Sequence, residues 1–454
     1  MLTAGCGYPI GSSPTTGSAS GSSVAGSVAV FTPSDSLVRG SDTPLGTWSR
    51  LRTELKKALV SVGFASGSIA TTASRTSDDQ GKAVRDFVDE ASSKSSSSAS
   101  STSTTLVVAP VPQDATGDDS YGDLLTRTAA DDTADSPILA NALTLARRSG
   151  MHVVLMSNAV DGFTPDLFVQ PSTARRIGRQ QALKLVDKIE LAKATVSNPR
   201  VIEVLIPRTN DATDADAFAG VWSVLGPYFR KGTAISVSGT LSSATTTADW
   251  ESVVYDAGSS SSAVTKNAAK ELASRLGDGD NGPTRIDGIV AMTDATASGV
   301  VNELKTLGYT GSSADVNPSI SISGIVEGIT GRRDITRSPV PDPTKGGSTS
   351  SAANSRWPIV TSFGASTGML PRIVDGRLWT TVVEDIATTT MQTAKACARL
   401  DAGEKASGLA SVTTAIVKGH RIPVLRPDLL SVSASNLKKT LIDPGYVSLA
   451  DAGL

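Results

Sequence analysis

The side chains that most often carry chemistry are scarce in this chain. Its 454 residues include two cysteines, Cys6 and Cys397, and two histidines, His152 and His420. Two cysteines are too few for a Cys-based zinc site or for a framework of disulfides. The phosphate-binding G-x-x-x-x-G-K-S/T, zinc-binding H-E-x-x-H and redox C-x-x-C patterns do not occur. We find no nucleophile–base pair and no ligand cluster, so we expect neither an enzyme nor a metal or other cofactor.

Polar side chains do follow several apolar segments directly. The positions are Thr32–Asp35, Ser157–Asn158, Pro207–Asp211, Thr293–Asp294 and Ser362–Ala365. In open α/β sheets, ligands bind outside the carboxyl ends of the strands. The pattern therefore predicts a site for a polar solute. Its candidate contacts are Asp35, Ser157, Asn158, Asp211, Thr293, Asp294, Phe363 and Gly364.

Two alternatives to a binding site stay open for these residues. Loops are polar in most proteins, so the pattern is also what plain connecting segments would show. The stretch TNDATDAD (209–216) places carboxylates just before a helical pattern. Acidic side chains there cap free N–H groups and oppose the helix dipole, which gives Asp211 a structural interpretation.

Strand–helix alternation positions these residues. The apolar runs SVAVF (27–31), TLVVAPV (105–111), MHVVLM (151–156), VIEVLIP (201–207) and IDGIVAM (286–292) alternate with segments of helical periodicity. This alternation is typical of parallel sheets with helices on both faces. A chain of this length usually divides into two domains. We expect an α/β fold of two Rossmann-like lobes, with Cys397 a buried thiol in a late helix.

Composition adds several smaller expectations. Residues 7–26 are almost entirely small or polar and predict a flexible linker. The Ser-rich run 92–105 predicts a loop, and residues 312–356 predict a loop-rich insertion. The net charge of −2 and the absence of basic blocks give no sign of a nucleic-acid partner. No segment approaches the ~18–20 apolar residues of a membrane span.

An ordered series of short segments carries a family resemblance. It includes the helix that begins at Trp48, Gln80, and the stretches 150–156, 177–187, 286–299, 372–383 and 422–448. In this order and spacing they resemble the type I periplasmic sugar-binding proteins of ABC importers, nearest the xylose- and ribose-binding branch. The likeness covers nearly all of 27–454, apart from the Ser-rich run and residues 312–356.

The resemblance implies two lobes joined by three crossovers. By analogy, lobe one would comprise 27–171 and 384–407, and lobe two 172–383 and 408–454. A sugar would bind between the lobes, which would close by a hinge motion and present the liganded form to a membrane permease. We expect a monomer.

Several charged positions of the family are replaced here. The Asp-Arg pair after the fourth strand is Ser157–Asn158, the Asn before Asp294 is Thr293, the late Gln-Asp pair is Phe363–Gly364, and a Lys near the third crossover is Glu384. Each charge-assisted hydrogen bond contributes roughly 1.5–3 kcal/mol. The site is therefore either rebuilt for another ligand or no longer binds a free sugar.

Aromatic residues offer a flat surface for a sugar ring. The candidates are Trp48, Trp250 and Phe363. Trp250 stands in a polar stretch, which favours a position facing the ligand. Trp48 lies on the apolar face of its helix, so packing in the core is the alternative.

Cys6 has a separate interpretation. The preceding Leu-Thr-Ala-Gly resembles a lipobox, although Leu2 lies one place further from the cysteine than usual and no hydrophobic signal segment precedes it. A lipid on Cys6, followed by a linker of ~25 Å reach, would tether the protein to the extracytoplasmic face of a membrane.

The leading hypothesis is a lipid-anchored solute receptor of an ABC importer with a carbohydrate-like ligand. The replaced charged positions keep a second hypothesis open, a degenerate binding fold that acts as a sensor or surface interaction module. A transcription regulator with this fold would need a helix-turn-helix ahead of Ser27, where the sequence predicts an unfolded tail.

Overall fold

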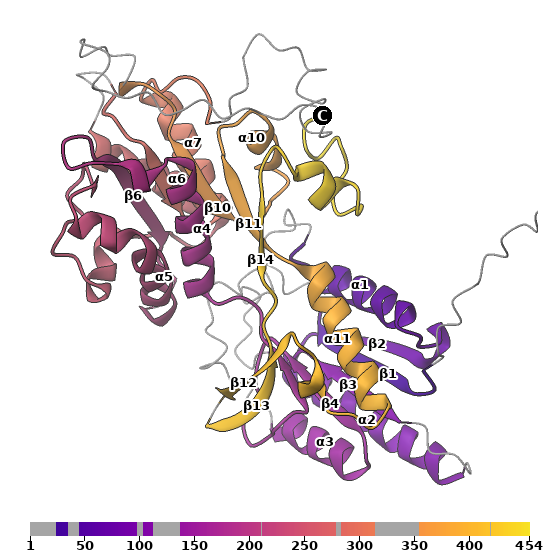
Figure 1. The fold of residues 1–454 in the computed structure, drawn as a ribbon. Coiled ribbons are helices and arrows are strands. Elements are labelled where there is room, and N and C mark those ends of the chain that lie inside the picture. Colours follow the sequence, from indigo (N-terminus) through magenta and orange to yellow (C-terminus); the bar gives the residue numbers. More distant parts are fainter. Residues whose placement is uncertain are drawn as a thin grey trace, which may run out of the picture.

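The computed structural model describes residues 24–34, 45–97, 103–111, 137–209, 211–277, 283–313, 354–417 and 419–454. Within these ranges the chain forms two seven-stranded sheets, each covered by helices on both faces (Figure 1). We call the first sheet with its helices lobe one and the second lobe two. The predicted α/β fold with two lobes of mostly parallel strands is confirmed. No helix among the described residues is long and apolar enough to cross a membrane.

Lobe one is built on a sheet with the strand order β12-β13-β5-β4-β3-β1-β2. Its strands are β1 (Ser27–Pro33), β2 (Ile69–Ser74), β3 (Thr104–Val108), β4 (His152–Met156), β5 (Leu167–Val169), β12 (Val412–Val417) and β13 (His420–Leu425). Its helices are α1 (Trp48–Ser61), α2 (Ser77–Ser97), α3 (Pro137–Arg148) and α11 (Ile386–Asp401). β12 is antiparallel to β13, and the remaining pairs are parallel.

The side chains of β1 show how this sheet separates two cores. Val28 and Val30 belong to the cluster that includes α1 and α11, whereas Ala29 and Phe31 belong to the cluster that includes α2 and α3. Successive side chains of a strand point to opposite faces, so an uninterrupted apolar run suits a sheet covered on both sides. Cys397 of α11 is fully buried as a free thiol, as expected.

Lobe two is built on the order β14-β11-β10-β9-β6-β7, with β8 also paired to β6. Its strands are β6 (Arg200–Pro207), β7 (Ala234–Ile235), β8 (Val254–Tyr255), β9 (Gly288–Ala291), β10 (Ile359–Phe363), β11 (Thr380–Glu384) and β14 (Leu429–Val432). Its helices are α4 (Ala174–Lys188), α5 (Asp211–Arg230), α6 (Ser261–Leu276), α7 (Asp294–Thr306) and α10 (Leu370–Val374). Short 3-10 turns at 66–68, 191–193, 247–253 and 406–408 and a π-helical turn at 438–442 complete the described elements.

Helices α4 and α5 pack unusually closely on one face of the second sheet. A Cβ on Gly220 of α5 would lie 2.0 Å from the carbonyl oxygen of Arg175 in α4. A Cβ on Gly178 of α4 would lie 2.4 Å from the carbonyl oxygen of Ala217 in α5. Both obstacles are backbone atoms, so each helix needs glycine where it meets the other.

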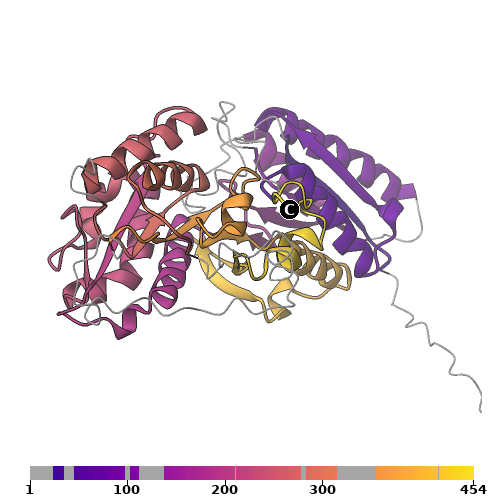
Figure 2. The ribbon, with the colours of Figure 1, turned by 90° about the horizontal axis from the view of Figure 1, so that it is seen from above.

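Three connections join the lobes. The first runs from β5 to α4 (170–173), the second passes from β11 to α11 at Asp385, and the third runs from β13 to β14 (426–428). The C-terminal segment 433–454 then packs beside α10, where a Cβ on Gly453 would lie 3.3 Å from Pro371. The same segment also contacts lobe one, because the guanidinium of Arg50 in α1 lies over the ring of Tyr446, 5.5 Å from its centroid. Figure 2 shows the two lobes side by side, and Figure 1 shows the C-terminus beside α10 of lobe two.

Two details differ from the sequence expectations. β12 and β13 extend the sheet of lobe one, whereas residues 408–454 were all expected in lobe two. The physical reason is the parallel pairing of β13 with β5, with Val424 opposite Phe168, which buries Ile422 and Val424. In addition, α2 continues to Ser97, into the Ser-rich run that was expected to be a loop.

Candidate functional site

The carboxyl ends of the strands in each sheet lie next to the connections between the lobes. β5 of lobe one ends at Val169, just before the first connection, and β11 of lobe two ends at Glu384, just before the second. Strands β1–β4 are parallel to β5 through their neighbours, and β6, β9 and β10 are parallel to β11. The carboxyl ends of both sheets therefore lie toward the opposite lobe, which is where the sequence predicted the candidate contacts.

In lobe one, the turn after β4 holds Ser157 in a left-handed conformation, with φ of +68°. Such a conformation is uncommon for a residue other than glycine. The Ser157 N–H donates to the carbonyl of Val169 (3.0 Å), and the Asn158 side-chain amide donates to the carbonyl of Pro110 (3.2 Å). The Ser157 hydroxyl is buried and has no hydrogen-bond partner among the described residues. Buried hydroxyls without a hydrogen-bond partner are rare in proteins.

Gln80 of α2 fixes the neighbouring end of β3. Its side-chain amide donates to the carbonyl of Ala109 (2.8 Å), and its carbonyl accepts from the N–H of Val111 (2.9 Å). Arg52 of α1 supports the end of β1 in a similar way, because its guanidinium donates to the Thr32 hydroxyl at 2.6 Å. Sequence reasoning missed Arg52, whose only signal was its place one turn into the helix after β1.

In lobe two, Asp294 is buried at the start of α7, with 5% of its surface exposed. One carboxylate oxygen accepts from the hydroxyls of Ser362 and of Thr381 (3.0 Å), and the other accepts from the N–H of Ser366 (2.6 Å). Burial raises the pKa of Asp294, and these hydrogen bonds oppose the rise. All of these donors belong to lobe two, so the carboxylate joins the end of β10 and the start of β11 to α7.

Three further predicted residues lie close to Asp294 or to its hydrogen-bond partners. Thr293 caps α7, with its hydroxyl accepting from the N–H of Thr296. Gly364 has φ of +136°, and a Cβ there would lie 3.3 Å from the carboxylate of Asp294. Glycine is therefore needed at this turn. Phe363 is partly buried against the core beneath α4 and α5.

The turn after β10 also contains a pattern that sequence reasoning overlooked. Residues Gly364–Gly368 read G-x-S-x-G, which in hydrolases surrounds a nucleophilic serine. Here the central Ser366 is buried and its N–H is bound to Asp294. Both histidines of the chain, His152 and His420, lie on strands of lobe one. The serine on lobe two therefore has no histidine on its own lobe to act as a base.

A second group of lobe two residues lies where β6 ends and α5 begins. Asp211, at the first position of α5, accepts a hydrogen bond from Arg208 at 3.0 Å, and its side chain is 81% exposed. The same guanidinium lies over the indole of Trp250, 5.2 Å from the ring centroid. Trp250 is half-buried in the 3-10 turn 247–253. This group presents an aromatic ring, a cation and an anion together.

The remaining predicted residues have other surroundings. Trp48 is 4% exposed and belongs to the core of lobe one, as its alternative interpretation held. Glu384 is buried at the second connection, where it accepts a hydrogen bond from the N–H of Ser172 (3.0 Å). Asp35, Cys6 and most of the insertion 312–356 lie outside the described residues.

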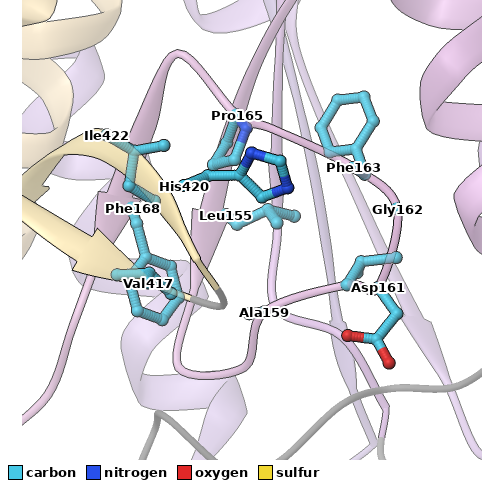
Figure 3. Close-up of a pocket in the computed structure, with 11 residues that line it drawn as sticks. Leu155, Ala159, Asp161, Gly162, Phe163, Pro165, Phe168, Val417, His420 and Ile422 are labelled. Carbon is cyan, nitrogen blue, oxygen red and sulfur yellow. The ribbon is translucent and has the colours of Figure 1, made fainter.

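A small pocket of about 60 Å³ lies elsewhere on lobe one, between the β4–β5 loop and the β12–β13 hairpin (Figure 3). Its wall is mostly apolar, with Phe168 and Ile422 among the lining residues, and Asp161 and His420 supply the polar groups. The pocket has room for a few water molecules rather than a sugar. None of the predicted site residues lines it. Within the described ranges, no group of three or more His, Cys, Asp or Glu side chains is placed to hold a metal ion.

No protein-family model and no curated protein matches the chain. Solved structures with a similar fold do exist. One is an ABC transporter solute-binding protein from Clostridium phytofermentans with bound β-D-glucose, at TM-score 0.53 and 18% identity over 94% of this chain and 99% of that chain. Another, from Chloroflexus aurantiacus in complex with D-glucose, has TM-score 0.50 and 17% identity over 93% and 97% of the two chains. A sugar ABC transporter protein from Actinomyces odontolyticus has TM-score 0.51 and 15% identity over 92% and 98%.

These similarities extend over almost the whole of both chains, and the proteins concerned are described as transport proteins rather than enzymes. The resemblance found in the sequence is thereby confirmed at the level of the fold. The chain has the two-lobed fold of the type I periplasmic solute-binding proteins of ABC transporters.

Proposed function

We propose that this protein is the solute-binding component of an ABC importer and that it binds a carbohydrate-like molecule between its lobes. Fold alone does not determine function, so the proposal depends on the residues that lie at the carboxyl ends of the strands. The observation that carries it is the Arg208–Asp211–Trp250 group on lobe two, on the side of the sheet that lies toward lobe one. An aromatic face beside hydrogen-bonding charged groups suits a molecule with an apolar ring face and polar edges. From lobe one, the unpartnered hydroxyl of Ser157 adds a donor or acceptor.

The test is titration calorimetry with a panel of neutral monosaccharides, sugar acids and nucleosides, together with native mass spectrometry for a co-purified ligand. We expect saturable binding of at least one compound. Arg208→Gln should weaken that binding at least tenfold, because a charge-assisted hydrogen bond contributes about 1.5–3 kcal/mol. Arg421→Gln is the matched control, since Arg421 is exposed near the amino end of β13, and it should change the affinity less than twofold. No binding across the panel and no co-purified molecule would refute the proposal.

A second candidate is a binding fold that serves as a sensor or surface interaction module. It is favoured by the two buried carboxylates at the strand ends, because Asp294 and Glu384 hydrogen-bond to their own chain. Fewer charged groups are then free to hold a sugar. A ligand-free protein in native mass spectrometry that still binds another protein would favour this candidate over the first.

The location we propose is the extracytoplasmic face of a membrane, with a lipid on Cys6 and an ABC permease as partner. Support comes from the lipobox-like sequence before Cys6 and from the fold shared with transporter binding proteins. Mass spectrometry of the protein from its native membrane should find a lipid-modified Cys6. An unmodified cysteine at the mature N-terminus would refute the anchor without affecting the ligand proposal.

A further inference from the structure

The buried carboxyl group of Glu384 lies where the three connections between the lobes meet. Glu384 is the last residue of β11 and directly precedes the second connection. Its side chain accepts from the N–H of Ser172 in the first connection, and its backbone pairs with Leu429, just after the third. Glu384 is thus hydrogen-bonded to the first connection, directly precedes the second, and is paired with the strand that follows the third.

The charged groups around Glu384 come from several elements. Arg176 of α4 donates from Nη2 to the carbonyl of Pro427 (2.8 Å) and to Asp428 (3.3 Å), both in the third connection. Its other terminal nitrogen, Nη1, is buried and makes no hydrogen bond with the described residues. Asp385 follows Glu384 and caps α11. Arg426 lies on the third connection and donates to Gln170 of the first. β14, which pairs with the Glu384 backbone, has no charged residue.

Few neighbouring groups stabilise the ionised form of this carboxyl group. The described hydrogen bonds give it one backbone donor, and the cation of Arg176 is engaged with the third connection instead. Burial raises the pKa of Glu384 to about 7, opposed by the N–H of Ser172, by the charge of Arg176 and by the Ser172 side chain. Asp385 raises it further, because two like charges on adjacent residues repel.

We propose that Glu384 makes the hinge sensitive to pH: the arrangement described here is that of the protonated carboxyl, and ionisation favours a different arrangement of the lobes in which the carboxylate reaches water or Arg176. The unpartnered Nη1 of Arg176 provides an internal destination for the charge. Movement of Arg176 toward Glu384 would loosen its bonds to Pro427 and Asp428, so the change at one connection is transmitted to another.

The size of the effect has an upper limit. If the alternative arrangement restores the ordinary carboxyl pKa of 4.5, the equilibrium between the two shifts by at most about 300-fold between acid pH and pH well above 7. A shift of this size is enough to reverse a two-state population that starts moderately biased. The inference concerns the hinge alone and does not depend on the identity of the ligand.

The experiment is small-angle X-ray scattering of the ligand-free full chain from pH 5 to pH 9. In the wild-type protein we expect the radius of gyration to change with a midpoint between pH 4.5 and about pH 7, the pKa values of the carboxyl in the two arrangements. Glu384→Gln, which keeps the shape and a carbonyl acceptor for Ser172, should remove the change. Asp385→Asn is the matched control: it keeps a helix cap and should preserve the transition but move its midpoint to lower pH, because a repelling charge is gone.

A second measurement separates titration from movement. Carbon-13 NMR of the labelled glutamate carboxyls, assigned through Glu384→Gln, should show Glu384 titrating above the ordinary carboxyl pKa of 4.5 and at or below about pH 7. Circular dichroism of the variant will show whether it is folded, and Glu384→Asp replaces it if it is not, with a retained but shifted transition expected. A radius of gyration that stays constant while Glu384 titrates would overturn the inference, as would an unchanged transition in Glu384→Gln.

Discussion

Replacing Asp294 distinguishes a structural carboxylate from a ligand-binding one. In the structure it accepts three hydrogen bonds, from Ser362, Thr381 and the N–H of Ser366, all within lobe two. In Asp294→Ala the two hydroxyls can turn to other acceptors, but the N–H of Ser366 cannot, and a buried unpaired donor costs about 1–3 kcal/mol. The hydrogen bonds themselves contribute about 1.5–3 kcal/mol each. Part of this is offset because the mutation also removes the desolvation of a buried charge.

We therefore expect Asp294→Ala to lower the free energy of unfolding by about 3 kcal/mol. Asp294→Asn should lower it by about 1 kcal/mol, since its amide oxygen can still accept from Ser366. Urea unfolding followed by circular dichroism measures both values. Asp211→Ala serves as the control, because it breaks an exposed ion pair that contributes at most about 1 kcal/mol. A loss below about 0.5 kcal/mol in Asp294→Ala would contradict the reasoning, and lost ligand binding at unchanged stability would show that the carboxylate serves the ligand instead.

Three further predictions concern packing, pH and the C-terminal segment. Gly220→Ala should destabilise the protein by about 3 kcal/mol in thermal unfolding, or prevent folding, because its Cβ would lie 2.0 Å from a backbone carbonyl oxygen. Gly67→Ala is the control and should be nearly neutral in the same assay, because the space around its Cβ is open. Glu384→Gln should match the wild-type free energy of unfolding near pH 4.5 and exceed it at pH 8 by at most about 3 kcal/mol in urea unfolding. The reason is that a carboxyl pKa raised from 4.5 to about 7 makes the wild-type protein lose stability as the pH rises between these values. Equal stability at pH 8 would be inconsistent with the raised pKa. Arg50→Ala and Tyr446→Ala should show a coupling of about 0.5–1 kcal/mol in a double-mutant cycle, and additive effects would mean that the contact between α1 and the C-terminal segment is not made in solution.

The sequence predicted the fold well because its signals are local. The unbroken apolar runs at β1, β4 and β6 and the helical spacing of Leu51, Leu55 and Leu59 do not depend on distant partners. The position of β13 could not be predicted in this way. Its six residues would suit either sheet, and the choice depends on pairing with β5, which lies far away in the chain.

The candidate site was predictable in outline but not in the role of each side chain. Residues at strand ends can be identified from the sequence, but the partners of a side chain cannot. Asp294 and Thr293 are adjacent in the sequence, yet one is buried against the end of β10 and the start of β11 and the other caps a helix. The placement of the Arg208 guanidinium over Trp250 joins residues from two separate segments, and no local pattern indicates it.

The pairing of β13 with β5 has a consequence for how the chain folds during synthesis. Gln170 and Arg426, at the ends of these strands, are 256 residues apart in the sequence. The sheet of lobe one is completed only by β13, and that of lobe two only by β14, which begins at Leu429. The ribosome must therefore have passed Leu429 before both sheets can gain their last strands. Contacts at such separation slow folding, so both lobes stay incomplete until late in the synthesis of these residues.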